Sequence, residues 1–132
     1  MIEFTARGHP NILGTHYNTL EFTKERAITK RATCIIGVRS DFSVEEIKEF
    51  FKGVKRVQFL LQVDSYTDRF TAEINQDFSS HEELVVRRSN FLSDRTLGIF
   101  ADKGSIDLSR DLMKCMADPK SVMKVIIKKV DD

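Results

Sequence analysis

Basic side chains gather around a glycine in the segment RRSNFLSDRTLGIFADKGSIDLSRDL, residues 87–112. We expect a strand that leads through a turn at Gly104 into a helix, whose N-terminus would offer unpaired N–H groups and a positive dipole end to an anion. Arginine suits phosphate or carboxylate because its planar guanidinium group donates two parallel hydrogen bonds. We therefore predict an anion-binding site formed by Arg7, His9, Arg95, Lys103 and Ser105.

The same basic residues could instead neutralise carboxylates of the chain itself. Acidic residues are nearly as numerous as basic ones in this segment. A carboxylate near the helix N-terminus would interact with the positive end of the helix dipole in place of a ligand. We favour such a structural network locally, while both hypotheses stay open from the sequence. The expected network joins Arg7, Arg87, Arg88 and Arg95 to Asp94, Asp102, Asp107 and Asp111.

A second candidate site is GHPNILGTH, residues 8–16, which holds two of the three histidines. Its proline and glycines favour a loop, so His9 and His16 could present imidazole nitrogens to Zn²⁺ or Fe²⁺. A third ligand such as Glu21 or Asp64 would be needed, and no recognised spacing such as H-x-H or H-E-x-x-H is present. A metal-dependent enzyme is therefore an alternative function.

Motifs for other chemistry are absent from the sequence. A nucleotide-hydrolysing P-loop is excluded, and no G-x-S-x-G elbow supports a covalent nucleophile. Asp64 and Asp68 flank an expected turn, where we expect solvated carboxylates. Cys34 and Cys115 lack C-x-x-C spacing and lie among apolar residues, so we expect buried reduced thiols, with a disulfide between them as the alternative.

The composition indicates one ordinary globular domain, residues 1–132. The net charge is +1, from 21 basic and 20 acidic residues, so no global field attracts a nucleic acid or an anionic membrane. The N-terminal residues MIEFTARGHP hold no apolar stretch for a signal peptide or a membrane span. We expect a cytoplasmic protein with no membrane partner.

Two observations bear on macromolecular partners. The chain has no Trp and two Tyr, and its ten Phe mostly fall at core positions, so few aromatic rings could stack on bases. We expect solvated charged faces in preference to nucleic-acid binding, which stays open. Phe50 lies beside Phe51 and only one of them can face the core well, so the other could cover a strand edge or form a homo-oligomer contact. The main basic positions are Lys24, Arg26, Lys30, Arg31, Lys128 and Lys129.

The elements that would position these sites are mostly strands. In RVQFLLQVD the residues Val57, Phe59, Leu61 and Val63 alternate with polar ones, which is typical of a strand with one buried face. Similar alternation and the spacing of turn residues favour an antiparallel sandwich or barrel, with the strand at 95–101 along one edge. The alternation of that strand covers residues 97–101, and the other strands are expected near residues 2–6, 20–22, 32–38, 70–74, 84–86 and 123–127.

Two segments have helical spacing instead. In SVEEIKEFFKG the apolar residues recur on one helical face, and Ser43 and Glu46 form a capping box. In DLSRDLMKCMADP a second apolar stripe follows Asp107, a plausible N-cap. We therefore predict a mostly β, α+β domain with two short helices.

Three sequence blocks are distinctive: ARGHPNILGTHYNTLEFTKE (6–25), CIIGVRSD (34–41) and RRSNFLSDRTLGIFADKGSIDL (87–108). They resemble an archaeal family known as domain of unknown function 371, and because the blocks spread over the chain, the resemblance is nearly full length. It implies an archaeal source and a jelly-roll-like β sandwich with a few helices. It implies no activity. Family members often carry a second small residue near Ser105 and a proline near Ser109, and serine at both positions implies a more flexible helix entry.

Overall fold

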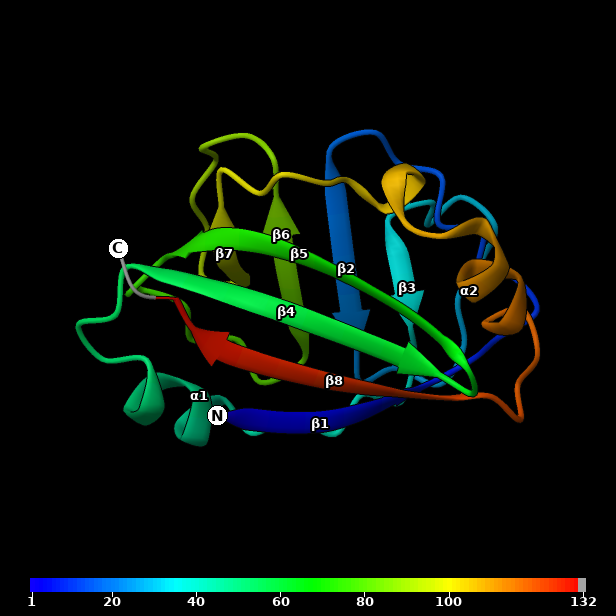
Figure 1. Ribbon diagram of the computed structural model, residues 1–132, viewed down its shortest axis with the longest axis horizontal. Helices are drawn as coiled ribbons and strands as arrows, with labels where there is room; N and C mark the ends of the chain where they lie inside the picture. Colours follow the sequence, from blue (N-terminus) through cyan, green and yellow to red (C-terminus); the bar gives the residue numbers. More distant parts are fainter. Residues whose placement is uncertain (131–132) are drawn as a thin grey trace.

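The computed structural model describes residues 1–130, which form eight strands, two α-helices and one 3₁₀ turn (Figure 1). The helices are α1 (Val44–Phe50) and α2 (Arg110–Cys115), and the 3₁₀ turn is Ser105–Asp107. The strands are β1 (Ile2–Arg7), β2 (Thr19–Thr23), β3 (Ile35–Gly37), β4 (Arg56–Val63), β5 (Tyr66–Ile74), β6 (Glu83–Arg87), β7 (Thr96–Ile99) and β8 (Val122–Lys129). A mostly β fold with two short helices is therefore confirmed.

The strands form one mixed sheet, in the order β1-β8-β4-β5-β7-β6-β2-β3. The pairs β2–β3 and β6–β7 are parallel, so the expectation of a wholly antiparallel arrangement is wrong. The reason is that loops 24–34 and 88–95 return the chain to the starting end of the sheet before the next strand begins. Strand β7 lies inside the sheet and not at its edge as expected. The jelly-roll sandwich is not confirmed, because the strands belong to a single sheet.

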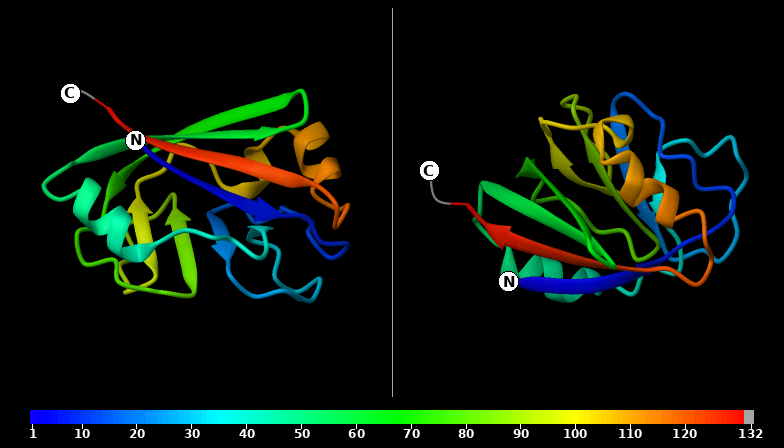
Figure 2. Two further views of the ribbon diagram at one scale, coloured as in Figure 1. Left: turned by 90° about the horizontal axis from the view of Figure 1, so that it is seen from below. Right: turned by 45° about the vertical axis from the view of Figure 1, so that its right-hand side comes forward.

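The sheet bends into two halves that enclose the core. Strands β1, β8, β4 and β5 form one half, and the strands of the other half run across them (Figures 1 and 2). Phe4 of β1 meets Phe22 of β2 edge to face across the interior, with ring centroids 5.2 Å apart. Phe59 and Phe70, paired across β4 and β5, stack at 4.6 Å. Such aromatic contacts add specific geometry to the burial of large apolar surfaces.

The helices lie near opposite ends of the enclosed space (Figure 1). Ser43 caps α1 as expected, because its side chain accepts the Glu46 N–H at 3.2 Å, but among the described residues the return bond of the expected capping box is not formed. The N-cap of α2 is Ser109, which accepts from the Leu112 N–H at 3.3 Å, so the expected Asp107 cap is wrong. Asp107 instead closes the 3₁₀ turn by accepting from the Gly104 N–H at 2.9 Å. Within residues 1–130, no helix is long and apolar enough to cross a membrane.

Phe50 and Phe51 both lie against the body of the domain. Phe51 is buried, and Phe50 is partly buried, with its ring edge-on to Phe51 at 5.1 Å. The ammonium group of Lys129 lies 4.5 Å from the centre of the Phe50 ring. This cation–π contact gives Phe50 a partner within its own chain. Homo-oligomerisation stays a prediction without support from this residue.

The two edges of the sheet meet at the end of β1. Arg7 and Val38 exchange N–H···O bonds of 2.7 and 2.9 Å, although β1 and β3 are the outermost strands. A Cβ atom added at Gly37 would lie 2.6 Å from Cβ of Ala6, far inside van der Waals contact. Glycine at this position therefore allows the two edges to approach. The contact brings residues 5–9 beside residues 38–41.

Gly37→Ala is expected to lower the free energy of unfolding by about 1–3 kcal/mol, because the added methyl group overpacks the contact with Ala6. Ala6→Gly in the same chain removes that clash, so the double variant should lose less stability than the sum of the single variants. Urea denaturation of the three variants measures this coupling. Strict additivity would contradict the contact between the sheet edges.

Candidate functional site

The structure separates the basic residues that the sequence grouped together. Arg7 and His9 lie at the end of β1, Arg95 directly precedes β7, and Lys103 lies between β7 and the 3₁₀ turn. Of these, only Arg7 and His9 line a common hollow. Arg95 and Lys103 each contact carboxylates of the protein itself.

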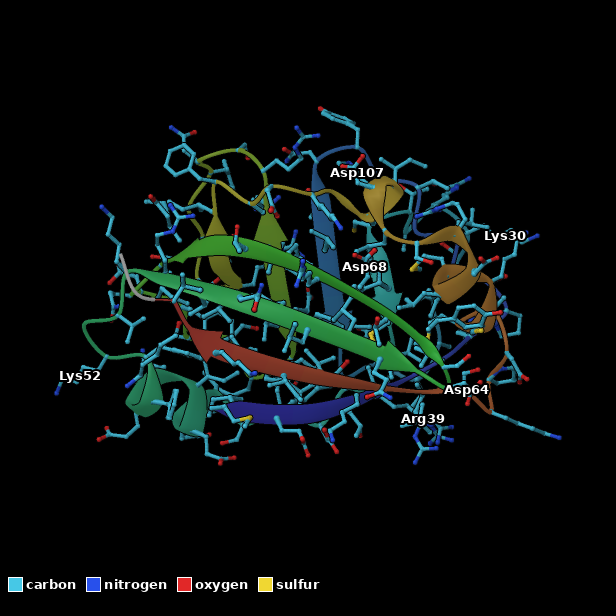
Figure 3. The ribbon with its side chains drawn as sticks, viewed as in Figure 1. Lys30, Arg39, Lys52, Asp64, Asp68 and Asp107 are labelled. Carbon is cyan, nitrogen blue, oxygen red and sulfur yellow. The ribbon has the colours of Figure 1, made fainter. Side chains whose placement is uncertain are left out.

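Asp68 of β5 supplies the negative charge at the entry of α2 (labelled in Figure 3). One carboxylate oxygen lies 2.6 Å from the Lys103 ammonium group, and the other accepts from the Ser109 N–H at 2.7 Å. Burial opposes ionisation, but these bonds and one from the Arg69 N–H outweigh it and hold the pKa of Asp68 below its ordinary value. The expectation that Asp68 is solvated is therefore wrong.

Ser105 is fully buried and joins three loops. Its hydroxyl oxygen accepts from the His16 N–H at 2.9 Å and lies 3.1 Å from the His16 carbonyl oxygen and 3.3 Å from that of Thr33. The hydroxyl therefore has bonding partners inside the protein, and no exposed surface is left for a ligand.

The expected charge network forms in part. Arg88 pairs with Asp107 at 3.5 Å, as predicted. Arg95 and Lys103 are paired as well, but with Glu21, Glu83 and Asp68, which were not among the predicted partners. In the described part of the chain, Asp94, Asp102 and Asp111 form no ion pair with the arginines of the segment.

The two histidines order separate turns. His9 accepts from the Asn11 N–H at 3.0 Å through Nδ1, and His16 accepts in the same way from the N–H groups of Asn18 and Thr19 at 3.1 and 3.0 Å. Across residues 1–130, no group of three or more His, Cys, Asp or Glu side chains could hold a metal ion. The metal hypothesis gains no support from this geometry.

A buried carboxylate lies on β2, whose five residues are all buried. Glu21 is 7% exposed, with Oε1 3.7 Å from Arg95 Nη1, and the Cys34 thiol donates to it over 3.8 Å. The same arginine nitrogen also binds Glu83. Burial, together with the neighbouring Glu83 carboxylate, raises the pKa of Glu21 to about 7 against the attraction of Arg95.

The cysteines are free thiols, as expected, so the disulfide alternative is not realised, but both are partly buried and not fully buried as predicted. Burial is the main cause that raises the pKa of Cys34 to about 11, and the Glu21 carboxylate adds to it. Because the thiolate is the nucleophile, Cys34 is a poor one at neutral pH.

A polar hollow of about 690 Å³ lies where the sheet edges meet. Three arginines from separate segments line it: Arg7 at the end of β1, Arg26 in the loop after β2, and Arg39 in the turn after β3. His9 adds an imidazole ring. Within residues 1–130, none of the three guanidinium groups forms an ion pair. Thr5, Gly8, Pro10, Val38, Asp41 and Pro119 complete the lining.

Backbone contacts hold the walls of the hollow together. The Arg39 N–H donates to the Glu25 carbonyl oxygen at 2.9 Å, which joins the turn after β3 to the loop after β2. Arg39 adopts φ +48°, a left-handed conformation that costs a non-glycine residue about 1–3 kcal/mol and is concentrated at functional sites. Asp41 accepts from both the N–H and the hydroxyl of Thr5, at 2.6 and 2.9 Å. Each of its two oxygens thus accepts one hydrogen bond from Thr5.

The sequence prediction included Arg7 and His9 but missed Arg26 and Arg39 as their partners. Arg26 belonged to a basic cluster that we expected to be solvated. A signal for Arg39 was present, because it stands in CIIGVRSD while Arg7 and His9 stand in ARGHPNILGTHYNTLEFTKE, two of the blocks that carry the family resemblance. The structure brings these two blocks together at the hollow.

Comparisons with known proteins agree with that resemblance. A family model described as "Domain of unknown function (DUF371)" matches residues 4–130. The chain is also similar to an uncharacterized protein of the archaeon Methanocaldococcus jannaschii, with 34% identity over 129 residues, which cover 92% of this chain and 96% of the relative.

Asp68→Asn is expected to lower the free energy of unfolding by about 2 kcal/mol, because hydrogen bonds to a charged group contribute more than neutral ones and Lys103 loses its partner. Asp77→Asn is the control, since Asp77 is exposed and forms no ion pair among the described residues. Its effect should stay within about 0.5 kcal/mol. Equal effects in urea denaturation would show that Asp68 does not organise the helix entry.

Stability should fall as pH rises from about 4.5 to about 7, the ordinary and folded-state pKa values of Glu21. In this window the folded state holds the Glu21 proton while the unfolded chain has lost it, so raising the pH favours unfolding, by about 3 kcal/mol in total. Glu21→Gln should remove this slope in urea denaturation between pH 5 and 8. Glu3→Gln, at an exposed acid paired with Lys124, should keep it. A slope that persists in Glu21→Gln would assign the effect to another group.

Proposed function

Because this chain belongs to the family described as domain of unknown function DUF371, a description that names no activity, we propose its function from the candidate site alone. We propose that the protein is a small binding module for an anionic ligand that carries phosphate or carboxylate groups. The ligand-binding residues are Arg7, His9, Arg26 and Arg39. The observation that carries this proposal is that three arginines line one hollow and none of them has an ion-pair partner within residues 1–130.

The contrast with three basic residues of the segment 87–112 supports the proposal. Arg88, Arg95 and Lys103 are each paired with a carboxylate of the protein. In the hollow, the three exposed guanidinium groups have no ion-pair partner within residues 1–130, so their combined positive charge can attract an anion. Among the described residues, Asp41 is the one carboxylate in the lining, so the arginines outnumber the acids there.

His9 suits the same role. Its Nδ1 atom accepts from the Asn11 N–H, so the neutral ring carries its proton on Nε2. This leaves Nε2 as a donor for an anion. A planar guanidinium group can bind a carboxylate or a phosphate through two parallel bonds, and three of them around one hollow give strong charge-assisted binding.

This site differs from the one that the sequence predicted, since Arg95, Lys103 and Ser105 are no longer part of it.

We also propose a cytoplasmic location. The two free thiols support it, because reducing compartments keep cysteines in this form.

Replacing any one arginine of the hollow should weaken anion binding. We expect Arg7→Gln, Arg26→Gln and Arg39→Gln each to lower the affinity for inorganic phosphate about tenfold or more, since each change removes at least one charge-assisted hydrogen bond. Isothermal titration calorimetry at low ionic strength measures the affinities. Thermal melting of each variant checks that the fold is retained.

Arg56→Gln is the matched control. Arg56 begins β4 at the end of the sheet near α1, whereas β1 ends at the opposite end (Figure 1). The same unit of charge is removed there, so phosphate affinity should stay unchanged. An equal loss in Arg56→Gln would show that binding follows net charge and that the hollow is not the site. Absence of phosphate binding by the unaltered protein would contradict the proposal for this anion.

A further inference from the structure

The hollow lined by Arg7, Arg26 and Arg39 also indicates the class of anion. We propose that the ligand is a small oligophosphate, with at least two linked phosphate groups, recognised through those groups alone. This inference rests on the proposed function, because it specifies the ligand of the same site. Three features support it: the size of the hollow, the chemistry of its lining, and the basic loop beside it.

The hollow is too large for one tetrahedral anion. Its volume is about 690 Å³, which falls within the range of small-molecule sites. A water molecule occupies about 30 Å³, and a single phosphate, a few times that size, would leave most of the hollow filled with solvent. Arginines from three segments can each bind different oxygens of a longer ligand. A chain of linked phosphates can accept hydrogen bonds from all three guanidinium groups at once.

The lining favours recognition by charge. Apart from the imidazole of His9, no aromatic ring is among the residues that line the hollow within the described chain. Stacking of a nucleobase needs such a ring, and contributes about 1–3 kcal/mol per base where it occurs. The site therefore has donors for phosphate oxygens and no platform for a base.

The basic loop after β2 extends the positive charge beyond the hollow. Residues 24–34 contain Lys24, Arg26, Lys30 and Arg31, against one acid, Glu25. Lys30 and Arg31 are exposed and have no ion-pair partner in the part of the chain that the structure describes.

Contacts on both sides bind this loop to the hollow. Asn11, two residues after His9, donates from its side chain to the Ile28 carbonyl oxygen at 2.8 Å. On the other side, the Arg39 N–H donates to the Glu25 carbonyl oxygen. Lys30 and Arg39 both lie on the side of the molecule away from Lys52, with Lys30 above and Arg39 below in the view (Figure 3). The loop thus adds positive charge on the same side of the molecule as the hollow.

The test compares anions by calorimetry on the full chain at one ionic strength. The probes are inorganic phosphate, pyrophosphate, tripolyphosphate and citrate, the last as a carboxylate of high charge. We expect pyrophosphate to bind at least tenfold more tightly than phosphate, and citrate to bind more weakly than pyrophosphate. The double variant Lys30→Gln, Arg31→Gln should lower tripolyphosphate affinity several-fold and leave phosphate affinity unchanged.

The outcomes distinguish this inference from the proposed function. Equal affinities for phosphate and pyrophosphate, or a preference for citrate, would overturn the oligophosphate assignment while anion binding stands. No binding of any of the four anions would overturn both. A single-stranded oligonucleotide that binds more tightly than tripolyphosphate and competes with it would also overturn the assignment, because the phosphates would then belong to a nucleic-acid backbone.

Discussion

The pair of backbone hydrogen bonds between Arg7 and Val38 is the contact on which the candidate site depends. It joins the two outermost strands of an eight-stranded sheet, and Gly37 allows the approach because it has no side chain to meet Ala6. Segments that are about thirty residues apart in the sequence thereby form one wall. Without this closure, Arg7 and Arg39 would lie on opposite edges of the sheet and could not share a ligand.

The free-energy cost of removing a charge from water explains how two basic residues outside the hollow, Arg95 and Lys103, are arranged. A charge that is partly removed from water needs a partner, and the protein supplies one for Lys103 in Asp68 and one for Arg95 in Glu83. Glu21 is buried beside the same arginine, and its burial, together with the neighbouring Glu83 carboxylate, raises its pKa to about 7 against the attraction of that guanidinium group. The arginines of the hollow stay exposed and need no internal partner. They line one hollow together and remain available to an anion there.

Much of the fold could be predicted from the sequence, because local patterns determine local structure. Alternation located all eight strands, and helical spacing with Ser43 located α1. The order of the strands and the two parallel pairs could not be predicted, since they depend on where long loops return the chain. The same limit applied to the candidate site: Arg7 and His9 are neighbours in the sequence, and they line one hollow in the structure. Arg26 and Arg39 join them there, and Arg95 and Lys103 lie elsewhere beside carboxylates, because of contacts between distant segments that the local patterns did not indicate.

The most direct test of the account is a ¹H–¹⁵N NMR titration of the intact chain with pyrophosphate. The amide signals of Gly8, His9, Arg26 and Arg39 should shift together and saturate with one dissociation constant, because one ligand contacts all three segments that line the hollow. The signals of Lys103 and Ser105 should stay in place. Saturable shifts at Lys103 and Ser105 with none at the hollow would contradict the account and return the site to the entry of α2.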